Sequence, residues 1–148
     1  MLTIAGAAIE SRVLAGLIDA GFDTIRPAHG YVVQRLLTGP QLVSAMAVDL
    51  GVSQQAISKM VKELVRLGFA AQRIDADDSR RRPIMLTDRG RAAVEKARAV
   101  RRELENDLRR TVGSDDLAAA QRVLSALIEH LGLTKHVAAR TVPAPLED

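Results

Sequence analysis

The chain has 148 residues, of which 47% are apolar and 26% are charged, and its formal net charge is +3. This length fits one domain with a substantial core, and the lack of cysteine excludes disulfides, thiol redox sensing and cysteine-ligated zinc. The sequence has neither an apolar run of membrane length nor a leading basic patch, so we expect no membrane span, no signal peptide and a cytoplasmic location.

Positive charge is concentrated in the middle of the chain. Residues 53–91 carry nine Lys or Arg against five Asp or Glu, whereas residues 1–52 and 113–148 are each net negative. A local excess of cations is typical of a segment that meets phosphates. This segment is therefore the candidate nucleic-acid-binding part of the chain.

Three helices are predicted ahead of the basic segment. Residues 3–20 and 28–37 place apolar side chains at helical intervals, and Gly21 is suited to end the first of them. Residues 41–42 are expected to be extended, and residues 44–50 form the third helix.

A helix-turn-helix pattern occupies residues 47–68. Gly51 suits the left-handed conformation that ends a helix, and the Ser53 hydroxyl can accept a hydrogen bond from the next helix. At about 100° per residue, that next helix has one apolar face. Its other face carries two amides, a hydroxyl, three cations and one acid: Gln54, Gln55, Ser58, Lys59, Lys62, Arg66 and Glu63.

The polar face has the chemistry of a DNA-reading helix. Amides and short hydroxyls recognise base edges in the major groove, and lysines contact phosphate or guanine. The alternative is ordinary solvation of a surface helix. The candidate DNA contacts are Ser53, Gln54, Gln55, Ser58, Lys59 and Lys62.

A β-hairpin is predicted directly after this helix. Residues 69–74 and 83–87 look extended, and the polar loop DADDSRRR joins them. A hairpin in this position is a wing, and Arg80, Arg81 and Arg82 at its tip suit the negative minor groove. The alternative is a solvated charge run paired with neighbouring aspartates.

Two long helices complete the predicted fold. Thr87 caps the first, whose narrow apolar stripe from Val94 to Leu108 is typical of a helix that packs along another helix. The second begins at Ser114 and runs to about Leu131. The remaining tail is expected to be loose.

The order of these elements resembles the MarR family of winged helix-turn-helix transcription regulators. The similarity rests on LGVSQQAISKMVKELVRLGF, on DADDSRRRPIMLTDRG and on residues 21–37, and it extends to about Leu131. It implies a mainly α fold with a small β wing in a single domain, residues 1–135. Within this domain, residues 28–91 form the winged head, residues 1–20 and 92–135 form dimerisation helices, and the tail is 136–148.

The resemblance also implies partners and residue roles. Family members are homodimers that place two winged heads on a pseudo-palindromic operator, with Asp78 bracing the wing and Arg80 entering the minor groove. Many respond to a small effector bound between the dimer helices and the head. His29 is the candidate effector contact, and its alternative is a packing or capping role at the helix start. The lack of cysteine excludes the branch that senses organic peroxides through a thiol.

The predicted function is therefore sequence-specific binding of double-stranded DNA by a ligand-responsive repressor. The alternative is a winged-helix module that binds protein or coats DNA without sequence choice, although coating needs mainly cations rather than amides. The sequence has neither a nucleophile elbow nor a glycine-rich phosphate loop, and its three histidines lack metal-ligand spacing. We expect no enzymatic activity, no cofactor and no metal.

Overall fold

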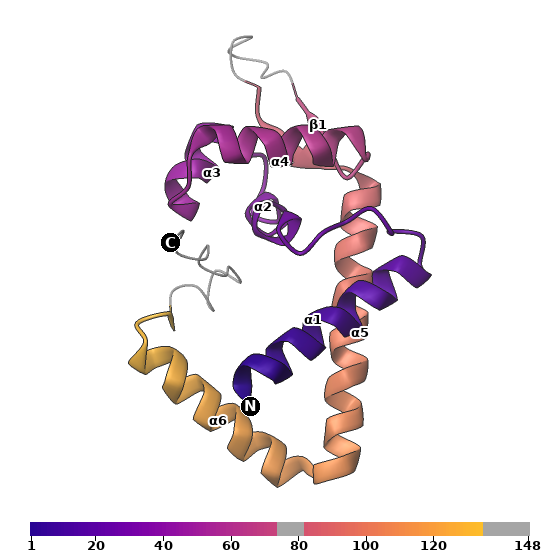
Figure 1. Ribbon diagram of the computed structural model, residues 1–148, viewed down its shortest axis with the longest axis vertical. Coiled ribbons are helices and arrows are strands. Elements are labelled where there is room, and N and C mark those ends of the chain that lie inside the picture. The colour runs from indigo at the N-terminus through magenta and orange to yellow at the C-terminus, as the bar shows by residue number, and fades with distance from the viewer. Residues whose placement is uncertain (74–81, 135–148) are drawn as a thin grey trace.

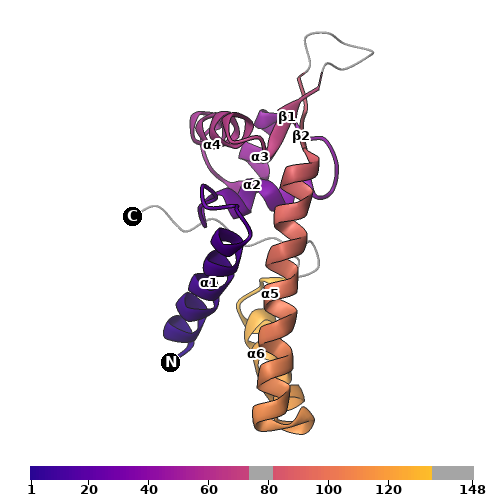
Figure 2. The same ribbon diagram turned by 90° about the vertical axis from the view of Figure 1, so that its right-hand side faces the viewer.

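The computed structural model describes residues 1–73 and 82–134. A head of three short helices and a small hairpin lies at one end of a long helix; one further helix crosses this long helix, and another extends at an angle from its far end (Figures 1 and 2). This mainly α architecture confirms the predicted fold class. The elements are α1 (Leu2–Asp19), α2 (His29–Leu36), α3 (Val43–Leu50), α4 (Gln54–Arg66), β1 (Ala70–Gln72), β2 (Ile84–Leu86), α5 (Asp88–Val112) and α6 (Ser114–His130).

One apolar core holds the head together. Val32 of α2, Met46 of α3 and Leu64 of α4 are fully buried in it. Phe69 and Ile84, from the hairpin, are also inaccessible to solvent. Burying large apolar side chains is the main favourable contribution to folding, so this shared core fixes α4 relative to the other head elements.

The hairpin is short, and a residue from the α2–α3 connection pairs with its second strand. β1 and β2 pair antiparallel, with Ala71 opposite Met85. Gln41 extends this sheet, since its N–H lies 2.9 Å from the Ile84 carbonyl and its carbonyl lies 2.8 Å from the Ile84 N–H. The stretch predicted to be extended at 41–42 therefore pairs with β2 through an isolated bridge at Gln41.

Two predicted segments lie outside the described residues. These are the loop at 74–81, which holds Asp78, Arg80 and Arg81, and the tail at 136–148. Arg82 is the one member of the predicted arginine tip within the described part of the chain.

The start of α5 is tied closely to the end of α4. The Thr87 hydroxyl accepts a hydrogen bond from the Gly90 N–H at 3.1 Å and donates one to the Gly68 carbonyl at 2.6 Å. The Arg89 guanidinium lies 4.9 Å from the centre of the Phe69 ring, within the range of a cation–π contact. Thr87 is therefore the cap that the sequence predicted, and it also fixes α5 to the head.

Beyond the head, α1 packs against α5. Val13 and Leu17 are buried there, and Gly16 allows a close approach because an added Cβ would lie 2.5 Å from a Val100 methyl group. The predicted stripe on α5 is buried only at the end near the head, since Leu108 is 43% exposed.

Many apolar side chains on α1, on the end of α5 and on α6 are exposed to solvent. No side chain of α6 is buried in the part of the chain that the structure describes. Large exposed apolar residues on α1, on the end of α5 and on and after α6 include Ile4, Ile9, Ile18, Leu108, Val112, Val123, Leu124, Leu127 and Leu131. None of the helices within residues 1–73 and 82–134 has the length and apolar character to cross a membrane.

Candidate nucleic-acid interface

The turn between α3 and α4 has the predicted geometry. Gly51 is left-handed, with φ 68° and ψ 27°, and the Val52 N–H donates to the Ala47 carbonyl at 3.1 Å. The Ser53 side chain then accepts a hydrogen bond from the Ala56 N–H at 3.2 Å. These contacts satisfy backbone groups that helix ends leave unpaired, and they set the direction in which α4 leaves the turn.

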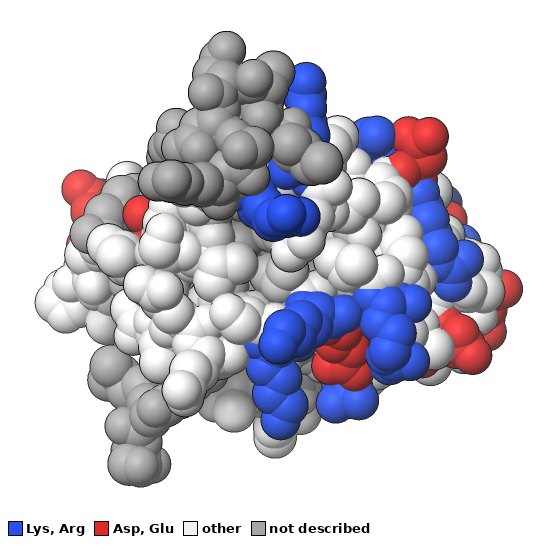
Figure 3. Space-filling model, turned by 90° about the horizontal axis from the view of Figure 1, so that it is seen from above, with Lys and Arg blue, Asp and Glu red and all other residues white. Residues whose placement is uncertain are grey.

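The two faces of α4 divide as predicted. Ile57, Val61 and Leu64 are buried against the head, so the opposite face is directed outward. Figure 3 looks down on this side of the molecule and shows Lys and Arg side chains gathered on it. Together the residues Gln54, Gln55, Ser58, Lys59 and Lys62 line one shallow hollow. The structure thus brings five of the predicted DNA contacts onto one accessible surface, beside the capping Ser53.

The base of the hairpin carries two exposed arginines. Arg82 is exposed immediately before Pro83, whose carbonyl accepts a hydrogen bond from the Arg73 N–H at 2.8 Å. Arg73 is also exposed. The sequence analysis did not name Arg73 as a site residue. Its position beside Arg82 and Pro83 follows from the pairing of the two strands, which the sequence does not specify.

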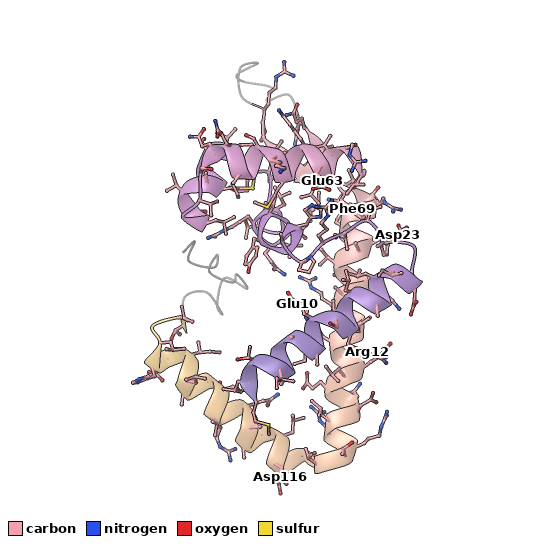
Figure 4. All side chains as sticks on the ribbon, in the orientation of Figure 1. Glu10, Arg12, Asp23, Glu63, Phe69 and Asp116 are labelled. Carbon is pink, nitrogen blue, oxygen red and sulfur yellow. The ribbon has the colours of Figure 1, made fainter. Side chains whose placement is uncertain are left out.

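Glu63, the lone acid of α4, joins this helix to the start of α2. Its carboxylate lies 2.8 Å from Arg26 Nη2 and 3.2 Å from His29 Nε2. Figure 4 shows Glu63 on the underside of α4, toward α2. His29 Nδ1 accepts a hydrogen bond from the Arg26 N–H at 3.1 Å, which leaves the proton of the neutral ring on Nε2 for donation to Glu63.

These contacts lower the pKa of Glu63 below its ordinary value. The hydrogen bond from His29 is the largest cause, and the positive charges of Arg26 and Arg66 act in the same direction, whereas partial desolvation opposes them. Glu63 is therefore a carboxylate at neutral pH and acts as an electrostatic brace between α4 and α2.

A cavity of about 210 Å³ lies between α1, α2 and α5. Apolar side chains from α1, from α5 and from α2 with its preceding connector form its wall. Figure 4 shows Glu10 of α1 directed toward this region. The lining residues are Glu10, Val13, Leu14, Leu17, Ile25, Arg26, Pro27, Gly30, Tyr31, Val33, Gln34, Ala93, Val94, Ala97, Arg98 and Arg101.

His29 is not among the lining residues, although Arg26 and Gly30 are. Its side chain is 2% exposed, and both ring nitrogens have partners. His29 is therefore packed inside the head, where it contacts Arg26 and Glu63, and it lies outside the wall of this cavity.

The cavity is cationic at its polar positions. Arg26, Arg98 and Arg101 contribute three positive charges against the single carboxylate of Glu10. Tyr31 is the one aromatic side chain among the described residues that line it. Within residues 1–73 and 82–134, no group of three or more His, Asp or Glu side chains is placed to hold a metal ion.

Together these elements define a winged helix-turn-helix protein. No family model matches the sequence, and a search of curated proteins gave no significant match. Solved structures give the fold: the chain is similar to RV1404 from Mycobacterium tuberculosis, with a TM-score of 0.75, 22% identity, and coverage of 86% of this chain and 88% of that one.

Two further neighbours are described by their function. One is the MarR family transcription regulator SP03579, with a TM-score of 0.66 and 23% identity over 88% of this chain and 83% of that one. The other is a point mutant of MepR from S. aureus bound to an oligodeoxyribonucleotide, with a TM-score of 0.65 and 19% identity over 88% of this chain and 94% of that one. The chain thus has the fold of MarR family transcription regulators.

Proposed function

We propose that this protein is a transcription regulator that binds double-stranded DNA at specific sequences. The observation that carries the proposal is the outward face of α4, where amides and cations share one accessible hollow on a helix whose other face is buried. The DNA-bound structure of MepR, which has a similar fold, supports the same use of this fold.

The proposed contacts divide by chemistry. Gln54, Gln55 and Ser58 would read base edges, because amides and hydroxyls can both donate and accept hydrogen bonds. Lys59 and Lys62 would contact phosphates. Ser53 acts mainly through its capping bond, which orients the start of α4. On the wing, Arg82 is proposed to contact DNA together with Arg80 and Arg81, and Asp78 is proposed to brace them.

We infer that the active form is a homodimer on a pseudo-palindromic operator. Exposed apolar side chains on α1, α5 and α6 form a surface far from the head, and large uncovered apolar surfaces mark interaction sites. A second copy of the chain would cover them. Two α4 helices related by a twofold axis would then enter major grooves about one helical turn apart.

The cavity supports a ligand-responsive repressor. It lies where α2 of the head meets α1 and α5, so a bound molecule would contact both the head and the proposed dimerisation helices. One solved structure of MepR, with 20% identity to this chain, has ethidium bromide bound. A dimer seated on a promoter would block transcription until a ligand released it.

The test begins with selection of bound fragments from genomic DNA, followed by titration of the selected duplex and unrelated duplexes. Gln55→Ala should weaken binding to the selected duplex by about 1–3 kcal/mol and relax base preference at one position. Lys62→Ala should weaken all duplexes alike and reduce the salt slope by about one.

Arg109→Ala is the matched control, because it removes a cation from the end of α5 opposite the head and should leave DNA affinity unchanged. Equal affinity for selected and unrelated duplexes would instead favour a module that coats DNA or binds protein.

A further inference from the structure

Two stretches of backbone connect the head to α1 and α5. One is the connector between α1 and α2, and the other is the junction between β2 and α5. The junction is held firmly, since Thr87 is hydrogen-bonded to the carbonyls of both Gly68 and Phe69. The connector begins just after α1, with Gly21 in a left-handed conformation at φ 81°. A contact that joins the connector to the junction would therefore restrain the angle between the head and these two helices.

Arg89 makes such a contact. It lies in the first turn of α5, and its guanidinium donates a hydrogen bond to the Gly21 carbonyl at 3.0 Å. The same guanidinium lies 5.3 Å from the centre of the Phe22 ring in the connector and 4.9 Å from the centre of the Phe69 ring, just before β1. The two ring centres are 6.1 Å apart. One cation therefore joins the end of α1, the connector and the hairpin to the start of α5.

We propose that Arg89 is a positioning residue that determines which spacing of operator half-sites the protein recognises. This inference rests on the DNA-binding homodimer proposed above. In that dimer, the angle of each head on α1 and α5 sets the separation of the two α4 helices. A head held at a fixed angle fits one separation of half-sites, whereas a loosely held head can adjust to others.

A change of one base pair is a demanding test of that angle. A turn of DNA holds about 10–10.5 base pairs in about 34–36 Å. One inserted base pair therefore moves the half-sites apart by about 3.4 Å and rotates one relative to the other by about 34°. A rigid dimer cannot follow both changes while keeping its contacts at both half-sites.

The contacts of Arg89 are large enough to influence this choice. The side chain is exposed, and a single exposed cation–π contact is weak. Arg89, however, contacts two rings and a carbonyl, and a dimer contains two copies of the arrangement. Its loss should reduce the preference for the native spacing by about fivefold or more, the factor expected for two such ring contacts.

The first experiment titrates three duplexes: the selected operator, and the same operator with one base pair inserted or removed between its half-sites. The ratio of the dissociation constants of the altered and selected duplexes measures the spacing preference. Arg89→Met keeps the length of the side chain but lacks the cation and the donors, so this ratio should fall by about fivefold or more. Phe22→Leu removes a ring without changing any charge, and it should lower the ratio as well.

Arg91→Met is the matched control. Arg91 lies two residues further along α5, and it donates hydrogen bonds to the Leu86 carbonyl and to the Asp88 carboxylate, both at 2.8 Å. Both partners belong to the junction between β2 and α5. Arg91→Met removes the same charge as Arg89→Met and should keep the wild-type ratio. If Arg89 instead contacted a phosphate, its loss would weaken all three duplexes alike and reduce the salt slope by about one.

The second experiment needs no DNA. The chain has no cysteine, so spin labels can be confined to cysteines introduced at the exposed Ser44 of α3 and the exposed Arg102 of α5. Labelled chains are diluted in unlabelled protein, and pulsed electron paramagnetic resonance then measures the distance between the head and α5 within one chain. The distance distribution should broaden in Arg89→Met and in Phe22→Leu, and it should stay unchanged in Arg91→Met.

Three results would overturn the proposal: a wild-type spacing ratio in Arg89→Met or Phe22→Leu, an equal fall of the ratio in Arg91→Met, or a wild-type distance distribution in Arg89→Met. Failure of the wild type to bind any duplex would refute the proposed function instead. The distance measurement would then still decide whether Arg89 holds the head against α5.

Discussion

Replacement of Gly90 by alanine tests the junction that orients the head on α5. An added Cβ would lie 2.1 Å from the Phe69 carbonyl oxygen, far inside the distance of about 3.3–3.6 Å at which carbon and carbonyl oxygen atoms make favourable contacts. Neither side can yield easily, because the same carbonyl accepts a hydrogen bond from the Thr87 N–H at 3.1 Å. The clash is therefore between two backbone segments, and relief requires α5 to move away from the strand.

The expected cost follows from three contributions. Overpacking costs about 1–3 kcal/mol, and losing the Thr87–Phe69 hydrogen bond costs about 1 kcal/mol more. Alanine is favoured over glycine inside a helix by about 1 kcal/mol. We therefore expect Gly90→Ala to lower the free energy of unfolding by about 1–3 kcal/mol, on balance of these contributions.

Urea denaturation at a fixed protein concentration measures this difference, since association would make stability concentration-dependent. The control is Gly30→Ala, because a Cβ on that helical glycine meets no atom within 4 Å and should leave stability unchanged or raise it by up to about 1 kcal/mol. Wild-type stability in Gly90→Ala would refute the reasoning about the junction.

Three further predictions concern capping, pH and assembly. Ser53→Ala removes the cap of α4 and should cost about 1 kcal/mol in urea denaturation, whereas Ser53→Asp should retain most of it; equal losses in both would contradict the capping role. Because the pKa of Glu63 is lowered in the fold, its contribution to stability is present above the ordinary carboxyl pKa of 4.5 and disappears as the pH falls through the lowered value. The stability advantage of wild type over Glu63→Gln should therefore shrink on acidification, and a constant difference would show that the brace is not ionic. Leu127→Asp, on the exposed apolar face of α6, should produce a monomer in sedimentation and weaken DNA binding, while an unchanged sedimentation coefficient would place the dimer interface elsewhere.

The features that the sequence predicted well are those fixed by local chemistry. The left-handed turn at Gly51, the caps at Ser53 and Thr87, and the two faces of α4 each depend on residues within a few positions of one another. Turn geometry, capping bonds and helical spacing act over that range, so a single sequence is enough to identify them.

The features that the sequence did not predict depend on tertiary packing. Glu63 meets His29 across 34 positions of the chain, and no local pattern indicates that these side chains touch. The fold places both ring nitrogens of His29 in hydrogen bonds within the head, which the sequence alone did not indicate. The cavity likewise exists only where α1, α2 and α5 meet.

For the terminal helices, the sequence predicts the apolar face but not its burial. Helical spacing shows which residues of α6 share a face, but it does not show what covers that face. In the single chain Val123 is 68% exposed and Leu131 is 58% exposed. The apolar face that the sequence indicates is therefore present, but these side chains are not buried. Burial of such side chains contributes about 25 cal/mol per Å² of apolar surface removed from water, and the proposed homodimer would gain this contribution.

Two kinds of contact hold α4 in the head. Its apolar face, with Ile57 and Leu64 inaccessible to solvent, cannot move without opening the core of the head. Its flank is held by Glu63 through contacts to Arg26 and His29, of which the arginine is mostly exposed and costs little to displace. The buried face therefore sets the position of α4 in the head, and the ion pair at Glu63 adds a weaker electrostatic contact toward the start of α2.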